Sequence, residues 1–366
     1  MQTLLIACRK FDNPLSDYFK TLGEQFLMNG FRVIFIFDNH FRKYERLEPI
    51  FQYYTWPSRR PTHLRDFLFL REIIKKEKPL ACLSNFGSAN VVTIVSRLMG
   101  VKCVMSYVHT PTAALKSDSL QSDHLYSFLL WRARLVRKLN HYLLTNSNGT
   151  KADAIHVYKV PGAKIFVFSP LINSSPIPYR PLESREKQLC IVGRLHPVKG
   201  HRSLLKQFKH VADAYPDMKL CIVGEGHLKE DLKELGTELG IAHQLLFTGG
   251  VRYSEINNLC SSSIACISAS VAEGFGLVNI EALREGTPVI CTRTAGSLDI
   301  VCEGSNGYFF DTDYPHSLLD AVNKLMVNWE SLSKNALDNF SEHYYIGTVE
   351  RHYQRLFSLI QTKIND

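Results

Sequence analysis

Two short stretches in the second half of the chain carry the residue types that bind anions. The first is Gly193-Arg194-Leu195-His196-Pro197-Val198-Lys199-Gly200, a turn that follows an apolar run and ends in glycine. An arginine binds two phosphate oxygens at once, and a lysine adds a compact positive charge. We therefore expect Arg194 and Lys199 to hold a phosphate-bearing ligand beside Gly193. The alternative is that both are surface charges next to a turn.

The second stretch places two glycines between two acidic residues. Glu273 is followed by Gly274, Phe275, Gly276 and Leu277, and Glu281 comes eight residues after Glu273. Glycines let the backbone approach a ligand closely, and the start of the helix expected here attracts an anion, most naturally a diphosphate. Glu281 would lie about 7 Å into that helix. Ionised carboxylates only accept hydrogen bonds, so both acids suit sugar hydroxyls. The alternative is an ordinary strand-to-helix turn in which Glu281 is solvated.

Parallel α/β domains are predicted to position these stretches, because apolar strands alternate with helical patterns along the whole chain. In the first half we expect strands at 4–8, 32–37, 81–85, 102–108 and 142–146. In the second half we expect them at 188–192, 219–223, 244–247, 265–268, 288–291 and 307–310. The predicted fold class is α/β, with two Rossmann-like doubly wound domains facing each other across a cleft. Ligands of such sheets bind at the carboxyl ends of the strands.

Length and composition agree with two globular domains. The chain has 366 residues, 45% hydrophobic and 21% charged, and no apolar run long enough to cross a membrane. We place an N-terminal domain at 1–170, a proline-rich linker at 171–187 and a C-terminal domain at 188–343. The last segment, 344–366, has apolar residues at helical spacing and is expected to pack back on the first domain.

The cysteines indicate a reducing compartment. There are nine, without any C-x-x-C pair, and most lie in apolar runs, which is typical of buried thiols in a cytoplasmic protein. Asp311-Thr312-Asp313 is expected to form a solvated turn. No cluster with metal-ligand spacing is apparent elsewhere, so the sequence predicts no metal site and catalysis without a metal.

Charge is unevenly distributed between the two halves. Residues 1–170 carry 24 basic and 12 acidic side chains, against 19 and 23 in the remainder. A basic half attracts anionic partners such as phosphates, nucleic acid or an anionic membrane. Within the basic segment 131–138, we favour an ordinary helix whose apolar residues pack on a sheet, over one lying on a membrane surface. No nucleic-acid-binding module is visible, so nucleic acid is the least favoured partner.

The motifs resemble those of retaining glycosyltransferases of family four, which have the two-domain GT-B fold. The resemblance rests on E-G-F-G-L-x-x-x-E from Glu273 to Glu281 and G-R-x-x-x-x-K-G from Gly193 to Gly200. It covers residues 188–330 specifically, including 223–226 and 247–251. It implies metal-independent transfer of a sugar from a nucleotide-diphosphate sugar, without a further cofactor, to a glycan or lipid-linked saccharide. The resemblance also implies that the C-terminal domain at 188–343 binds the donor and that the N-terminal domain at 1–170 is on the acceptor side. It also implies a cytoplasmic enzyme, with peripheral contact at an anionic inner membrane surface.

Residue roles follow from this resemblance. It implies that Arg194 and Lys199 hold the donor diphosphate and that Glu281 accepts from the ribose hydroxyls. Glu273, with the backbone of Gly274, Phe275 and Gly276, would face the transferred sugar. Two further positions, Gly250 and Val251, match the region beside the nucleobase. His109, at the end of the strand 103–108, matches a family histidine that projects toward the sugar, although a lone histidine is also compatible with a structural role.

One departure leaves alternatives open. Family members commonly have a glycine pair in the first strand-to-helix turn, where this chain has Lys10-Phe11-Asp12-Asn13-Pro14-Leu15-Ser16. Acceptor handling is therefore in question. The alternatives are a nucleotide-sugar epimerase of the same architecture and a non-catalytic nucleotide-binding module.

Overall fold

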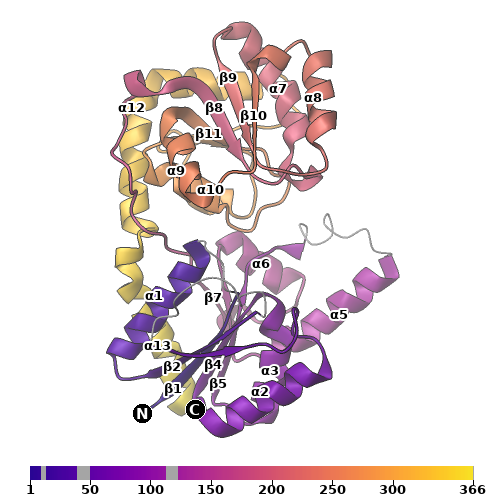
Figure 1. The fold of residues 1–366 in the computed structure, drawn as a ribbon, viewed down its shortest axis with the longest axis vertical. Coiled ribbons are helices and arrows are strands. Elements are labelled where there is room, and N and C mark those ends of the chain that lie inside the picture. Colours follow the sequence, from indigo (N-terminus) through magenta and orange to yellow (C-terminus); the bar gives the residue numbers. More distant parts are fainter. Residues whose placement is uncertain (10–13, 39–49, 113–122, 366) are drawn as a thin grey trace. The chain divides into compact units, whose positions relative to one another are not determined.

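A computed structural model describes residues 1–9, 14–38, 50–112 and 123–365 (Figure 1). The chain forms two compact units. Unit 1 comprises Met1–His109, Gln121–Asn173 and Tyr345–Asp366, and unit 2 comprises Thr110–Leu120 and Ser174–Tyr344. No described helix combines the length and apolarity that crossing a bilayer requires. Each unit is an α/β fold with a parallel sheet, which confirms the predicted fold class.

Unit 1 contains a seven-stranded sheet in the order β3-β2-β1-β4-β5-β6-β7. Its strands are β1 (Thr3–Ala7), β2 (Arg32–Phe37), β3 (Gln52–Thr55), β4 (Ala81–Asn85), β5 (Cys103–Val108), β6 (Tyr142–Thr145) and β7 (Ile165–Val167). The helices are α1 (Pro14–Met28), α2 (Leu64–Glu77), α3 (Ala89–Leu98), α5 (Asp123–Leu139), α6 (Asn148–His156) and α13 (Val349–Asn365).

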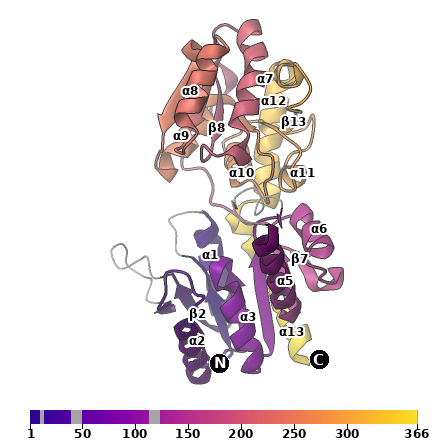
Figure 2. The ribbon, with the colours of Figure 1, turned by 90° about the vertical axis from the view of Figure 1, so that its right-hand side faces the viewer.

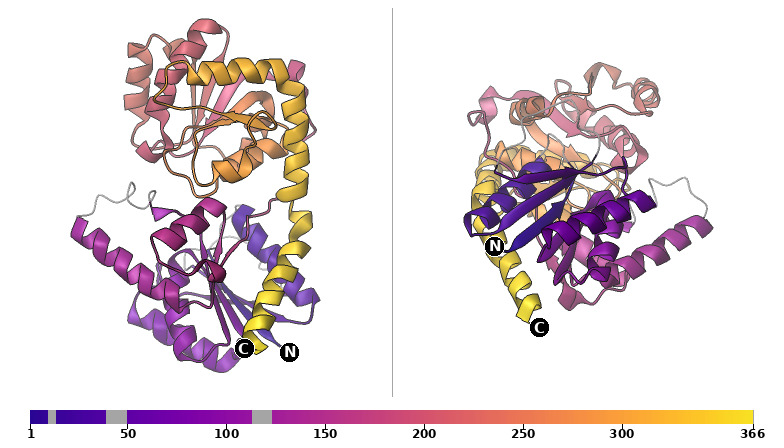
Figure 3. Two further views of the ribbon diagram at one scale, coloured as in Figure 1. Left: turned by 180° about the vertical axis from the view of Figure 1, so that it is seen from behind. Right: turned by 60° about the horizontal axis from the view of Figure 1, so that its bottom comes forward.

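Helices cover both faces of this sheet, as an all-parallel sheet requires. Alternate residues of β1 point to opposite faces: Leu4 and Ile6 belong to one core cluster, and Leu5 and Ala7 to another. The first cluster takes in side chains of α1 and α13, so the last helix packs on unit 1 (Figure 3). The second takes in side chains of α2 and α3.

Unit 2 contains a six-stranded sheet in the order β10-β9-β8-β11-β12-β13. Its strands are β8 (Glu186–Val192), β9 (Lys219–Val223), β10 (Leu245–Gly249), β11 (Ser263–Ser268), β12 (Val289–Cys291) and β13 (Gly307–Phe309). The helices are α7 (His201–Ala214), α8 (Lys229–Glu238), α9 (Tyr253–Ser262), α10 (Leu277–Arg284), α11 (Ser297–Ile300) and α12 (Ser317–His343). Helices α7 and α12 pack side by side (Figure 2). Because β8 to β11 are neighbours, the loops at their carboxyl ends gather along one edge.

Candidate functional site

The glycine turn after β8 is fastened to the loop after β9 through backbone contacts. Gly193 N donates to Val223 O at 2.9 Å, and Leu195 N donates to Glu225 O at 2.9 Å. Gly224, at φ 138°, lies so close that a Cβ there would stand 2.0 Å from the carbonyl oxygen of Gly193. Only glycine fits this approach. Main-chain atoms therefore hold the turn that carries Arg194 and Lys199 in place.

Gly200 fastens the other end of that turn. Its φ is 68°, and a Cβ at this position would stand 1.9 Å from the carbonyl oxygen of Ala269, in the loop that follows β11. The turn between β8 and α7 and the loop between β11 and α10 thus pack directly against each other. This close approach brings the two stretches identified from the sequence into one site.

An ion pair joins the two stretches. Lys199 Nζ donates to Glu273 Oε2, and Ser270 Oγ donates to the same oxygen at 3.4 Å. The side chains of Lys199 and Glu273 are 26% and 23% exposed, so the pair is neither solvated nor fully buried. Arg194, in the same turn, is exposed. A cation and a carboxylate that meet at a partly open surface are both available to a ligand that replaces one of them.

The loop between Glu273 and α10 delivers the helix N-terminus to this position. Gly276 precedes α10 at φ 93°. Gly296 N donates to Glu273 O at 3.0 Å, and a Cβ on Gly296 would stand 2.2 Å from Phe275 O. Phe275 itself is buried. Gly296 and the buried Phe275 thus hold this loop in place. The first turn of α10 lies at the partly exposed end of the site, where the helix dipole favours negative charge.

Two buried polar side chains near these helix ends were not singled out from the sequence. Asn279, in the first turn of α10, is 1% exposed, and neither its amide oxygen nor its amide nitrogen has a hydrogen-bond partner. The same holds for both ring nitrogens of His201, at the start of α7. Burial, with Lys199 close by, lowers the pKa of His201 to about 4, so the ring is neutral. The only sequence signal for them was a polar residue within three positions after a glycine, Gly200 for His201 and Gly276 for Asn279.

Glu281 is more deeply buried than we expected for a residue that accepts from ribose hydroxyls. It is 3% exposed and lies on α10. Burial raises the pKa of its carboxyl, and the nearby Tyr253 and Arg284 side chains oppose that rise. Arg284 also forms a 2.8 Å ion pair with Glu285. Glu281 is thus part of a buried polar cluster, and it is not a solvated helix residue.

Gly250 and Val251 lie at the end of β10, on the same edge. Gly250 N donates to Glu225 Oε1 at 3.2 Å, and Gly224 N donates to Gly249 O at 2.8 Å. The loops after β8, β9 and β10 are thus linked one to the next. Val251 is partly exposed beside them.

His109 belongs to unit 1, where it follows β5. Its Nε2 is hydrogen-bonded to Asn85 Oδ1, and its ring stacks on Phe86 with centroids 4.2 Å apart. Because an amide oxygen only accepts, the hydrogen lies on Nε2 and the lone pair on Nδ1. Burial lowers the pKa of His109 to about 3, so its imidazole is neutral at physiological pH.

Asp311 and Asp313 form the turn that we expected. Asp313 N donates to Asp311 Oδ1 at 2.9 Å, and Asp311 N donates to Ser317 Oγ at 2.9 Å. This turn borders a pocket of about 480 Å³ at the ends of β11, β12 and β13, lined by Ser270, Thr292, Arg293 and Tyr314 among others. The first strand-to-helix turn, in contrast, falls mostly on residues 10–13, outside the described part of the chain.

The chain is similar to known glycosyltransferases. Over 358 residues it is 24% identical to an uncharacterised glycosyltransferase of Methanocaldococcus jannaschii, covering 90% of each chain. It is 28% identical to the N-acetylgalactosamine-N,N'-diacetylbacillosaminyl-diphospho-undecaprenol 4-alpha-N-acetylgalactosaminyltransferase of Campylobacter jejuni, covering 67% of this chain and 66% of that one.

A solved structure and a family model agree with these relatives. The crystal structure of HepE from Anabaena in complex with UDP superimposes with a TM-score of 0.74 at 14% identity, covering 98% of this chain and 100% of that one. The family model of the glycosyl transferases group 1 matches residues 179–340, which contain both site loops of unit 2. Residues 179–340 therefore resemble the group 1 glycosyl transferases, and the chain has the two-domain fold of GT-B glycosyltransferases.

Proposed function

We propose that this chain is a retaining glycosyltransferase, and that it moves a sugar from a nucleotide-diphosphate sugar to a glycan or lipid-linked acceptor without a metal ion. The observation that carries the proposal is the Lys199–Glu273 ion pair at the start of α10, within the part of the chain that matches the family. HepE binds UDP, which supports a nucleotide-linked donor.

The ion pair suggests how the donor enters. A diphosphate brings more negative charge than the Glu273 carboxylate, so it would take over Lys199 and release Glu273. Arg194 and the α10 N-terminus would add donors to the same phosphates. Positive groups at a leaving diphosphate stabilise the charge that grows as the glycosidic bond breaks. Glu273, released from Lys199, would accept hydrogen bonds from hydroxyls of the transferred sugar.

The other site residues would contact the remaining parts of the donor. Glu281 and the buried groups around it would meet the ribose, since a carboxylate that is costly to bury gains from hydroxyl donors. Gly250 and Val251 would border the nucleobase. His109, neutral and with a lone pair on Nδ1, would accept a hydrogen bond from the transferred sugar.

The proposal is tested by a donor screen followed by product analysis. Purified protein would be mixed with sugar nucleotides of UDP, GDP and ADP, and binding read as a rise in melting temperature. The binding donor is then incubated with a saccharide acceptor, with and without a chelator, and the anomeric configuration of the product is read by NMR. We expect transfer with retention in both cases. An inverted product refutes the retaining mechanism, and an epimerised donor without transfer supports the epimerase.

A lipid-linked acceptor is favoured by the exposed face of α5. Phe128, Trp131, Leu135 and Leu139 are 54%, 56%, 47% and 44% exposed, and their spacing of three to four residues places them on one side of the helix. This corrects our expectation that the apolar residues of segment 131–138 pack on the sheet. Val136 is buried, and Leu130 and Ala133 pack against the core cluster that contains Leu143 and Tyr158, but Trp131 and Leu135 are exposed.

Exposed cations lie on the same side of α5. Arg132 and Lys138 are exposed beside the apolar residues, and α5 lies at one margin of unit 1 (Figure 3). Aromatic and aliphatic side chains with basic neighbours are what peripheral helices insert into an anionic membrane surface. We propose that α5 holds the enzyme at the cytoplasmic surface of an anionic membrane, where lipid-linked acceptors are found.

Vesicle flotation tests this surface. We expect wild-type protein to float with vesicles containing phosphatidylglycerol and to stay behind with neutral vesicles. The double variant Trp131→Ser/Leu135→Ser should bind at least roughly 100-fold more weakly, since two large apolar side chains together contribute about 3–6 kcal/mol when fully buried. Val327→Ser removes an exposed apolar residue of unit 2 and is the matched control. Equal binding to both vesicle types refutes the attraction of the basic residues to anionic lipid. Unchanged binding of the double variant refutes the proposal that the apolar face of α5 contacts the membrane.

A further inference from the structure

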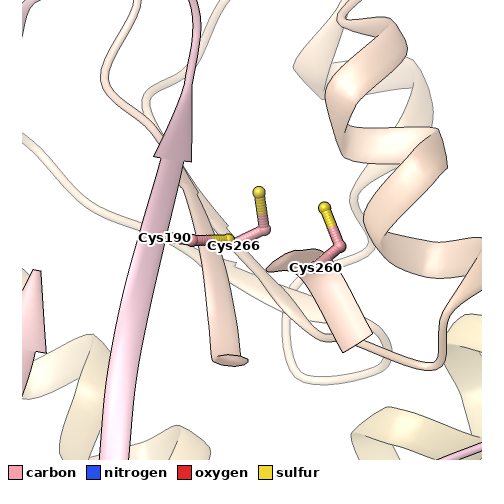
Figure 4. Close-up of side chains that lie close together, drawn as sticks. All are labelled: Cys190, Cys260 and Cys266. Carbon is pink, nitrogen blue, oxygen red and sulfur yellow. The ribbon is translucent and has the colours of Figure 1, made fainter. Parts of the chain in front are cut away.

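Three cysteines that are far apart in the sequence converge in the core of unit 2. Cys190 lies on β8, Cys260 in the last turn of α9, and Cys266 on β11 (Figure 4). Their sulfur atoms all lie within 4.8 Å of one another, and each residue is 0% exposed. None of the three belongs to the loops of the donor site. The proposed transfer reaction leaves this cluster without a role.

Strand register brings the thiols together. Cys190 and Cys266 are direct partners in the parallel pairing of β8 with β11. Cys260 precedes β11 by only a few residues, so α9 delivers its thiol to the same place. Because two of the three positions are related by strand pairing, the sequence alone shows no ligand motif here. The sequence prediction of no metal site rested on the lack of metal-ligand spacing, and spacing does not reveal a group that forms through strand pairing.

A buried cation lies beside the cluster. The guanidinium of Arg185, a residue that is 7% exposed, donates from Nη1 to the carbonyl oxygens of Ser263 at 2.8 Å and of Cys260 at 3.5 Å. Three thiolates around a divalent ion leave one negative charge, and the Arg185 guanidinium balances it. A buried charge of that size is tolerated only when it is paired in this way.

We propose that Cys190, Cys260 and Cys266 form a binding site for one soft divalent cation, with Zn²⁺ as the natural ligand. Thiolates prefer soft cations, and zinc–sulfur bonds of about 2.3 Å place sulfurs about 3.8 Å apart around a tetrahedral ion. The observed sulfur–sulfur spacing, at most 4.8 Å, is within about 1 Å of that value. Binding converts three thiols to thiolates and releases three protons. Because the thiols are buried, the ion loads during folding or through local opening.

Cadmium provides a spectroscopic probe of this site. Purified protein is unfolded under reducing conditions and refolded with one equivalent of Cd²⁺, and the thiolate-to-cadmium charge-transfer absorption is recorded. We expect one ion per chain, a charge-transfer band, and a higher melting temperature than the metal-free protein shows. The variants Cys190→Ser, Cys260→Ser and Cys266→Ser should each bind at least about tenfold more weakly, since even the loss of a hydrogen-bond partner of a metal ligand costs about 10–100-fold in affinity. Cys291→Ser, a buried cysteine on neighbouring β12, is the matched control and should leave the band unchanged.

A second measurement needs no variant. X-ray absorption at the zinc edge of wild-type protein counts the sulfur neighbours of the bound ion, and we expect three. The proposal is overturned if refolded wild-type protein shows no charge-transfer band, if the Cys291→Ser variant loses the band as the cluster variants do, or if the ion has no sulfur neighbours. Both readouts are independent of sugar transfer, so their failure leaves the proposed function intact.

Discussion

The carboxyl edges of the two sheets are built in different ways. In unit 2 the loops at this edge are locked to one another by their backbones: Gly200 abuts Ala269 O, and Gly224 abuts Gly193 O. In unit 1 the corresponding position after β5 is held by side chains, with His109 stacked on Phe86 and hydrogen-bonded to Asn85.

This difference matches the ligands that we propose for the two units. A diphosphate and a ribose are the same in every nucleotide sugar of one base, so a rigid main-chain frame suits them. An acceptor varies between enzymes, and side chains change without disturbing the sheet. The contrast therefore predicts that substitutions in unit 2 disturb the shared chemistry and that those in unit 1 tune it.

Removal of the Lys199 cation should have the largest effect. We expect Lys199→Ala to lower kcat/KM for the donor by about 10²–10³-fold, the usual cost of losing a group that stabilises transition-state charge. Lys187→Ala, an exposed lysine of the same unit, is the control. Steady-state kinetics with the donor found in the screen check this. An unchanged kcat/KM would remove Lys199 from the diphosphate site.

The close backbone approach of Gly200 to Ala269 O should contribute to the unfolding free energy. Gly200→Ala forces a Cβ against Ala269 O and a non-glycine residue into positive φ, so we expect unit 2 to lose about 2–4 kcal/mol of unfolding free energy. Gly240→Ala has the same backbone strain, at φ 72°, but nothing lies within 4 Å of its Cβ, so it should cost only about 1 kcal/mol. Chemical denaturation of both variants measures the difference. Equal losses would show that the close approach contributes nothing.

Glu281 should oppose stability at neutral pH. Burial raises the pKa of its carboxyl in the folded protein, so the folded state becomes less favourable as pH rises through the unfolded value toward the folded one. We expect Glu281→Gln to raise the melting temperature by roughly 2–4 °C at pH 7 and to weaken donor binding. The gain in melting temperature should shrink near pH 4, where the Glu281 carboxyl is mostly protonated in the folded and in the unfolded protein. A gain that is equal at both pH values would contradict the assignment.

His109 should affect the rate without shaping its pH dependence. Its pKa is lowered to about 3, so the ring stays neutral from pH 5 to 8. The folded protein loses stability from this group only as pH falls below the unfolded value. We expect His109→Gln to reduce kcat by roughly tenfold, with a pH profile of unchanged shape. If the wild-type pH profile of kcat changed near neutral pH and this change were absent in His109→Gln, the histidine would titrate during turnover, which contradicts this prediction.

Buried strands were predictable from the sequence, and contacts between distant residues were not. Runs such as 220–223 are apolar throughout, which is typical of a strand covered on both faces. The edge strands β3 and β7 were missed: β3 is largely half-exposed, and β7 has only three residues. The contact of Lys199 with Glu273 and that of Cys190 with Cys266 depend on sheet order and register, which composition and spacing do not encode.

Nucleoside diphosphate binding to paired variants tests the central claim most directly. Isothermal titration would compare wild-type protein, Lys199→Ala and Glu273→Gln with the nucleoside diphosphate selected in the screen. Because the Glu273 carboxylate competes with phosphate for Lys199, we expect Lys199→Ala to bind at least about tenfold more weakly and Glu273→Gln to bind more tightly than wild type. If both variants bind as wild type does, or if both weaken equally, the diphosphate does not replace Glu273 at Lys199.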